Sequence, residues 1–269
     1  MCVCLNWRVY NVKRTISLGS TYFWLLAIFL YLPILLLVIF SFNNDESLRF
    51  PLSGFTMRWY EALFDAGELL QAAGNSIVVG IWSSLLATIL GTMAAIAVVR
   101  YDFPGKQALL AVAALPLVIP SVVIGVALLI LFRQMVDVEL SLLTMGLGHV
   151  VINIPIVMLI VAARLAGFPT NLEEAAMDLC CTYWGALRRV TLPICLPALF
   201  AAFLTAFTTS VDEYAMSVFL VGTDATLPVY MYSQLRFPRK LPIIVALGSI
   251  ILVLSIAMIL VSEWLRRND

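Results

Sequence analysis

Two adjacent carboxylates, Asp212 and Glu213, stand in an apolar part of the chain that is long enough to cross a membrane. A carboxylate near the centre of a bilayer costs about 2.5–3.5 kcal/mol on insertion scales, so it is expected to face a cavity or a partner. Neighbouring residues on a helix point about 100° apart. Both carboxylates therefore reach one aqueous pathway only if that pathway is wide or if the helix loosens there.

Hydroxyl and aromatic side chains flank the pair, and carboxylates beside an aromatic ring suit a flexible organic polycation through ion pairs and a cation–π contact. In the structural alternative, one carboxylate lies near the outer interface and pairs with Arg133 or with the basic cluster at 236–240. For the hydroxyl side chains alone, including Thr208, helix packing is the favoured interpretation. The predicted substrate pathway comprises Thr209, Ser210, Asp212, Glu213 and Tyr214.

The longest polar and charged interruption in the second half of the chain runs from Thr170 to Pro197. Thr170, with Glu173 three residues later, predicts a capping box at the start of a short helix. Apolar residues then recur at helical spacing and form a narrow stripe: Leu172, Ala175, Ala176 and Leu179. Alanine side chains allow close approach, so the stripe predicts a docking surface for a partner.

A second short helix is predicted over 183–190, with Thr182 as its cap. Leu192 and Pro193 are then expected to turn the chain back into apolar sequence. The two helices together predict an amphipathic hairpin beside a membrane.

The same residues carry a resemblance to a known family. Glu174-Ala175-Ala176, three residues, a small position, nine residues and then the run from Val190 to Pro193 closely resemble the EAA loop of binding-protein-dependent ABC importer permeases. The resemblance implies a cytoplasmic loop whose first helix docks in a groove of an ATPase subunit. It also implies that the coupling residues are Glu173, Glu174, Ala175, Ala176, Asp178, Leu179, Cys180, Arg188, Leu192 and Pro193.

One position departs from the family pattern, because Cys180 stands where the family usually has glycine. Glycine adopts a left-handed backbone at little cost, whereas cysteine does not. The angle between the two helices, or the tightness of docking, is therefore open. The roles of the charged residues are open as well. Glu174 and Asp178 either meet basic residues of the partner or are simply solvated. Arg188 either contacts partner carboxylates or is one of the positive charges expected on the cytoplasmic side.

The elements that must position these residues are membrane spans. The chain has 269 residues, of which 62% are hydrophobic and 12% charged, and its mean hydropathy is +1.02. This composition is that of a polytopic membrane protein. The predicted spans cover 21–42, 76–99, 108–132, 142–163, 198–221 and 241–261. An external loop is predicted over 43–74, with a short helix at 58–70, and Pro116 and Pro120 are expected to break the third span.

Six spans place both termini in the cytoplasm, and about ten of the 16 Lys and Arg then lie inside, in agreement with the positive-inside rule. The predicted organisation is a cytoplasmic segment at 1–20 and a transmembrane permease domain at 21–269, with the coupling loop at 164–197. The fold class is an all-α membrane protein. His149, in the fourth span, is interpreted as a hydrogen-bonded helix contact in preference to a proton relay.

The resemblance extends beyond the loop to nearly all of the chain after its first few residues. The run 75–106 looks like the opening of the core of the family, and the runs 54–64, 115–132 and 226–237 resemble the spermidine/putrescine-type permeases. The implied protein is a permease subunit of a type I importer in the bacterial cytoplasmic membrane. Its implied partners are a second permease subunit of a different sequence, two ATPase subunits and an external substrate-binding protein.

Other classes of function fit the sequence less well. Pro104-Gly105-Lys106 lacks the upstream glycine of a P-loop and is followed by Gln107, so ATP and Mg²⁺ are expected on the partner ATPase and no cofactor on this chain. The five cysteines and one histidine include no CxxC, and no metal site is expected. The zero net charge gives no support to nucleic-acid binding. The first alternative is the same machinery importing an opine, aminoethylphosphonate or another small solute. A remote alternative is an intramembrane aspartyl protease, but the GxGD motif of that class does not follow Asp102.

Overall fold

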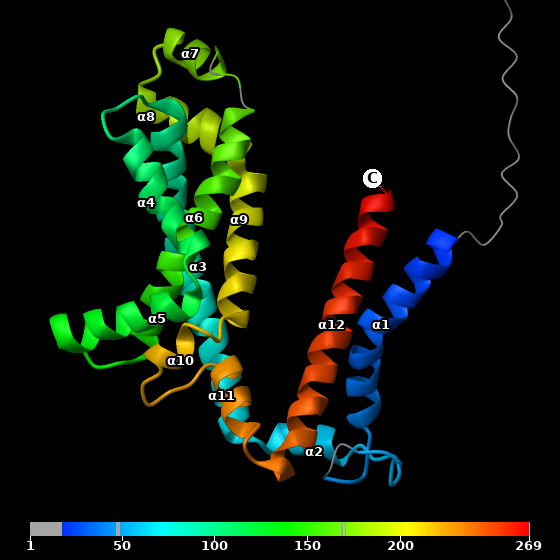
Figure 1. Ribbon diagram of the computed structural model, residues 1–269. Helices are drawn as coiled ribbons and strands as arrows, with labels where there is room; N and C mark the ends of the chain where they lie inside the picture. The colour runs from blue at the N-terminus through cyan, green and yellow to red at the C-terminus, as the bar shows by residue number, and fades with distance from the viewer. Residues whose placement is uncertain (1–17, 47–48, 168, 170, 269) are drawn as a thin grey trace, which may run out of the picture. The chain divides into compact units, whose positions relative to one another are not determined.

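The computed structural model describes residues 18–268 apart from 47–48, 168 and 170. These residues form helices and connecting loops, with one isolated β-bridge between Asn43 and Phe55 (Figure 1). They divide into two compact units. The first combines the chain up to Asp65 with the chain from Phe237 onward, and the second is Ala66–Arg236.

The first unit is a helix pair closed by a loop. Its elements are α1 (Leu18–Phe40), α2 (Arg58–Asp65), the 3-10 turn η3 (Pro238–Lys240) and α12 (Leu241–Asn268). Helix α12 contacts both α1 and α2 (Figure 1). Helix α2 is shorter than the helix predicted over 58–70, because it ends at Asp65, where the chain enters the second unit.

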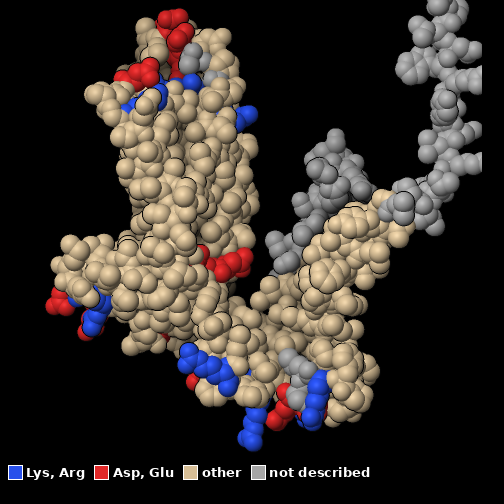
Figure 2. All heavy atoms as spheres, viewed as in Figure 1, with Lys and Arg blue, Asp and Glu red and all other residues tan. Residues whose placement is uncertain are grey.

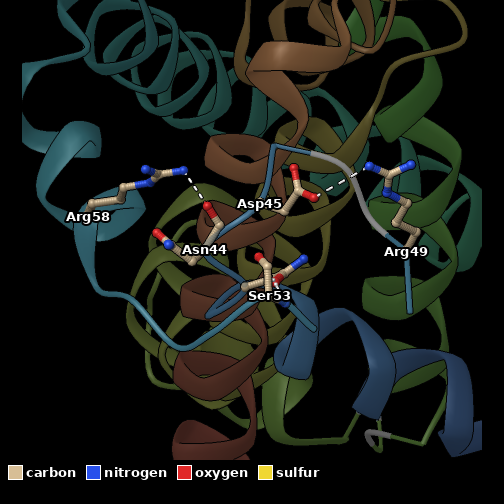
Figure 3. Close-up of polar contacts among 6 residues, drawn as sticks. Asn44, Asp45, Arg49, Ser53 and Arg58 are labelled. Carbon is tan, nitrogen blue, oxygen red and sulfur yellow. Dashed lines mark hydrogen bonds and ion pairs between the residues drawn. The ribbon is translucent and has the colours of Figure 1, made fainter. Parts of the chain in front are cut away.

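Polar contacts order the loop between α1 and α2. Arg58 donates to the backbone carbonyl of Asn44, and Asp45 pairs with Arg49 at 3.8 Å (Figure 3). The guanidinium of Arg58 also lies 4.2 Å from the centre of the Trp59 ring. These contacts give a compact cap to the first unit in place of an open loop.

The second unit is built on a bundle of long helices that pack side by side. Its elements are α3 (Gly67–Arg100), α4 (Lys106–Val118), α5 (Ser121–Ile130), the π-helical turn η1 (Leu131–Met135), α6 (Leu142–Ala166), α7 (Asn171–Asp178), α8 (Tyr183–Ala186), the π-helical turn η2 (Leu187–Thr191), α9 (Leu192–Asp212), α10 (Ser217–Leu220) and α11 (Leu227–Gln234). Helices α3, α6 and α9 contact one another along their lengths. Small residues allow this packing: a side chain on Gly91 of α3 would lie 2.7 Å from Val157 of α6.

The proline-bearing span is broken at Pro120, as the sequence predicts, whereas Pro116 lies inside α4 and does not end it. Helices α4 and α5 meet at a bend of 107°, with Pro120 at the N-cap of α5 (Figure 1). A proline there donates no backbone hydrogen bond and its ring obstructs the preceding turn. The bend turns α5 away from the axis of α4.

Two predicted span boundaries are wrong. Helix α3 begins at Gly67, nine residues before the predicted start at Ser76, so residues 67–74 are helical and do not belong to a loop. Helix α9 begins at Leu192 and ends at Asp212, although the predicted span covers 198–221. Among the described residues, four helices are long and apolar enough to cross a membrane, or five if the bent α4–α5 pair counts as one span.

Charged side chains of the second unit gather at the ends of its helix bundle. Figure 2 shows a long uncharged flank between acidic and basic side chains around α7 and α8 at one end and charged side chains at the other. Charged groups are costly within hydrocarbon, so this distribution is typical of a bundle embedded in a bilayer. The protein is a multi-pass membrane protein.

Candidate functional site

The predicted coupling hairpin forms at one end of the bundle (Figure 1). Helix α7 ends in a left-handed turn, because Cys180 has a φ of 63°. The amide of Cys180 donates to the carbonyl of Met177 at 2.9 Å, and the amide of Cys181 donates to that of Ala176 at 3.1 Å. This is the Schellman motif, which satisfies the last carbonyls of a helix. Cysteine thus takes the conformation that glycine usually supplies, at a cost of about 1–2 kcal/mol.

The start of the hairpin is only partly described. Thr170, the predicted cap of the first helix, lies outside the described residues. Thr182, the predicted cap of the second, accepts a hydrogen bond from the amide of Gly185 at 3.2 Å. The second cap is therefore confirmed.

Glu173 faces inward and holds three segments together. Its carboxylate forms an ion pair with Arg100 at 3.1 Å, at the end of α3, and accepts a hydrogen bond from the Thr191 hydroxyl at 2.7 Å. The Arg100 and Glu173 side chains are only 9% and 10% exposed. An ion pair at this depth with an added hydrogen bond fixes the register of α7 against α3 and η2. Glu173 is thus a positioning residue of the hairpin, and not part of its exposed surface.

The outer surface of α7 is exposed and mixed in character. Apolar and acidic side chains alternate on it, with Leu172 46% and Leu179 84% exposed. Glu174 and Asp178 are exposed one turn apart. Exposed apolar side chains of this size beside carboxylates are typical of a docking surface. The exposed predicted coupling residues are Glu174, Ala175, Asp178, Leu179, Cys180, Arg188 and Pro193, whereas Ala176 and Leu192 are half-buried.

The expected turn at Leu192 and Pro193 is wrong. Helix α8 continues without a break through η2 into α9, and together they run from Tyr183 to Asp212. Pro193 has no backbone N–H to donate, and it lies just after η2, whose wider turn departs there from the regular α-helical hydrogen-bond pattern. One continuous helix therefore joins the hairpin to the predicted pathway.

The predicted pathway carboxylates lie where that helix stops. Asp212 is the last residue of α9 and is exposed, and Glu213 follows in extended conformation with φ of −73° and ψ of 109°. The Glu213 carboxylate accepts a hydrogen bond from the amide of Met216 at 2.9 Å. The helix thus ends at the pair, which removes the fixed 100° separation expected of helical neighbours. Figure 2 shows acidic side chains at this end of α9.

The hydroxyl residues beside the pair have different roles. Ser210 is buried and lies 3.1 Å from the Ser83 hydroxyl, and its hydroxyl also bonds Nδ1 of His149. Nε2 of His149 lies 2.8 Å from the hydroxyl of Ser217. This network joins α3, α6, α9 and α10, so His149 is a hydrogen-bonded helix contact. Thr209 donates to its own helix at the carbonyl four residues earlier.

Aromatic rings stand beside the carboxylates. The Tyr214 and Tyr232 rings are 4.5 Å apart, centre to centre, and tilted by 36°. Tyr232 belongs to α11, so this contact ties the end of α9 to the next helix along the chain. Among the described residues of the second unit, no ion pair joins Asp212 or Glu213 to Arg133 or Arg236.

Comparison with known proteins identifies the kind of protein. Residues 87–268 match the model of a family described as the binding-protein-dependent transport system inner membrane component. The match spans well over half of the chain. The chain belongs to this family. The permease is accordingly a membrane subunit of an ABC importer that works with a binding protein, and it is not itself an enzyme.

Several named relatives resemble the permease over most of their length. It is 36% identical over 255 residues to the spermidine/putrescine transport system permease protein PotC of Haemophilus influenzae. That alignment covers 94% of this chain and 97% of the relative. It is 34% identical over 243 residues to PotC of Escherichia coli K12, with 89% and 90% covered. It is 35% identical over 231 residues to the putrescine transport system permease protein PotI of the same strain, with 83% and 82% covered.

Solved structures confirm the fold. A bacterial ABC transporter involved in the import of the acidic polysaccharide alginate matches with a TM-score of 0.67 at 16% identity, covering 93% of this chain and 94% of the other. The alginate transporter in complex with an alginate pentasaccharide-bound periplasmic protein matches with a TM-score of 0.70 at 18% identity, covering 93% and 92%. The predicted all-α permease fold is confirmed, while six spans and cytoplasmic termini stay predictions.

Sequence reasoning missed the residues that anchor the permease's hairpin. No local pattern assigned a role to Arg100 or Thr191, yet both bond Glu173. No spacing rule links residues 73 positions apart. Tyr232, the partner of Tyr214, was missed for the same reason.

Proposed function

We propose that this permease subunit moves a small organic polycation of the spermidine and putrescine class across the membrane. The observation that carries the proposal is the pair Asp212 and Glu213 at the exposed end of α9, followed by Tyr214, whose ring contacts that of Tyr232. Carboxylates attract ammonium groups, and tyrosine faces add cation–π attraction. The names of the PotC and PotI relatives support this class over an opine or a phosphonate.

The coupling proposal assigns the exposed surface of α7 to an ATPase subunit. ATP-driven closure of two such subunits would move α7, and with it the residues bonded through Glu173. Helix α8, η2 and α9 are continuous, so that movement reaches Asp212 at the far end of the same rod. Access to the carboxylates would then alternate between the outer and the inner side of the membrane.

The proposed assembly contains a second, different permease chain and two ATPase subunits beside the external binding protein, in the bacterial cytoplasmic membrane. ATP and Mg²⁺ belong to the ATPase subunits, and this chain holds no cofactor of its own. Support for these partners comes from the family and from the exposed hairpin surface, with Leu179 84% exposed.

Uptake of labelled putrescine and spermidine tests the proposed function. Cells carrying the whole transporter would be compared with cells carrying Asp212→Asn or Glu213→Gln, with assembly checked by co-purification. Glu139→Gln is the matched control, since it removes an exposed carboxylate from a loop of the same unit. We expect uptake to fall about tenfold or more in the pathway variants and to stay unchanged in the control. Uptake that is equal in all four strains would contradict the proposal.

A further inference from the structure

A polar cavity lies at the end of the second unit opposite the coupling hairpin. It has a volume of about 340 Å³, near the lower end of the usual range for small-molecule sites. The first turns of α3 and the segment from Thr223 through α11 form its walls, and α11 contacts α3 in this region (Figure 1). Glu68 lines the cavity from the first turn of α3, and Arg100 binds the hairpin from the last turn of the same helix. The cavity and the hairpin therefore lie at opposite ends of α3.

The walls of the cavity are held in place by hydrogen bonds between the two segments. The Gln71 amide donates to the carboxylate of Asp224 at 3.2 Å, and the Asn75 amide donates to the carbonyl of Ala225 at 3.0 Å. The backbone amide of Leu227 donates to a hydroxyl of α3 at 2.8 Å. The cavity is therefore part of the folded unit, with its side chains already oriented.

Every wall side chain that carries an N–H or O–H already donates to a protein acceptor. Besides Gln71 and Asn75, the Tyr230 hydroxyl donates to Glu68 at 3.5 Å and the Thr223 hydroxyl to Asp224 at 3.1 Å. The Gln234 amide donates to the hydroxyl of the residue before it at 3.2 Å. Burial and the neighbouring carboxylate raise the pKa of Tyr230, so its phenol stays protonated and remains a donor.

The described wall residues carry negative charge and one acceptor without a partner. Glu68 and Asp224 are carboxylates, and the residues that line the cavity include no Lys or Arg. Gln234 is only 8% exposed, and within the described part of the chain its side-chain oxygen has no hydrogen-bond partner. A buried amide oxygen without a donor is destabilising, and a ligand with N–H groups would satisfy it.

We propose that this cavity binds an organic ammonium group, with Glu68, Asp224 and the Gln234 amide oxygen as its acceptors. An ammonium carries donors and no acceptor, which complements two carboxylates and an amide oxygen in walls that carry no Lys or Arg. Two carboxylates, amide oxygens and a tyrosine ring suit a diamine better than a bare metal ion, and among the described residues no set of three acidic, His or Cys side chains is placed to hold a metal.

This is a second site, separate from the carboxylates at the end of α9. It lies at the end of the bundle opposite the hairpin, so in the predicted topology it faces the side from which the binding protein delivers its ligand. The chemistry of the cavity is independent of the proposed function, which enters only through the choice of putrescine as the probe. The site would receive one end of the diamine before the molecule enters the pathway.

Equilibrium binding of labelled putrescine to the assembled transporter in nanodiscs, without binding protein or ATP, tests the proposal. The variant Glu68→Gln with Asp224→Asn removes both charges and keeps the side-chain shapes. We expect it to weaken binding about tenfold or more, and Gln234→Met to weaken it severalfold. Glu61→Gln is the matched control, because Glu61 is an exposed acid that does not line the cavity, and it should leave binding unchanged.

Two further comparisons make the outcome decisive. Unlabelled 1,4-butanediol, which has the same length as putrescine without its charges, should not compete for the site. Asp212→Asn should leave this binding in place. Binding lost in Asp212→Asn and retained in the Glu68 and Asp224 double variant would overturn the inference while leaving the proposed pathway intact. Binding that is weakened in the double variant, in a transporter that takes up no polyamine, would sustain the inference and reject the proposed function.

Discussion

Replacing Glu173 by alanine should loosen the coupling hairpin from the bundle. The substitution removes the carboxylate from a guanidinium that is 9% exposed and takes away the acceptor of the Thr191 hydroxyl. Breaking a buried ion pair in this way costs about 3–5 kcal/mol. Since 1.4 kcal/mol is a factor of about ten, the opening equilibrium of the hairpin should rise about a hundredfold or more.

Hydrogen exchange measured by mass spectrometry on the permease in nanodiscs checks this expectation. Peptides from α7 and η2 should exchange about a hundred times faster in Glu173→Ala, while the middle of α3 stays protected. Glu174→Gln is the matched control, because it removes the same charge from the adjacent exposed position and should change exchange by less than a factor of about three. Equal exchange in the two variants would refute the anchoring role of Glu173.

Three other substitutions probe separate parts of the structure. Cys180→Gly relieves the left-handed backbone and should stabilise the hairpin by about 1 kcal/mol, seen as slower exchange across α7. Gly222→Ala would place a side chain 2.0 Å from the carbonyl oxygen of Leu140. The free energy of unfolding should fall by about 1–3 kcal/mol, measured as a lower melting temperature of the purified chain. Ser210→Ala removes a partner of the buried His149 and should lower the same melting temperature by a comparable amount, whereas Ser210→Thr should restore part of it.

Apolar length and proline position were enough to predict most of the helices. The sequence predicted the helices at α1, α6 and α12 and the break at Pro120, because each depends on local composition or on a residue with one strong backbone preference. The start of α3 was predicted too late, because the polar Glu68 and Gln71 fall in the external loop predicted over 43–74, with Glu68 in its short helix at 58–70. Both line the polar cavity, while Leu69 between them and Ala72 after them are buried, so the helical period was present in the sequence.

The details that matter for the site depend on contacts between distant segments. Glu173 and Glu174 are identical in type and adjacent, yet one is buried against Arg100 and the other is exposed. The sequence predicted both as coupling residues, since nothing local distinguishes them. The sequence did not indicate that α9 ends at Asp212, because apolar residues continue past that position. The hydrogen bond from the amide of Met216 to the Glu213 carboxylate forms where the helix ends.

The five-residue π-helical turn between α8 and α9 lies on the helical path from the hairpin to the pathway carboxylate. A π-helical turn holds about one residue more than an α-helical turn, and each residue rotates a helix by about 100°. Deleting Val190 would let this turn close into a regular α-helical turn with one residue fewer, so Asp212 would keep nearly the same direction relative to the hairpin. Deleting a residue from the regular part of α9 would instead rotate Asp212, roughly 30 Å away at about 1.5 Å of rise per residue, by about 100°. The π-helical turn is therefore the place in this helix where a change of length alters least which face of α9 meets the solute.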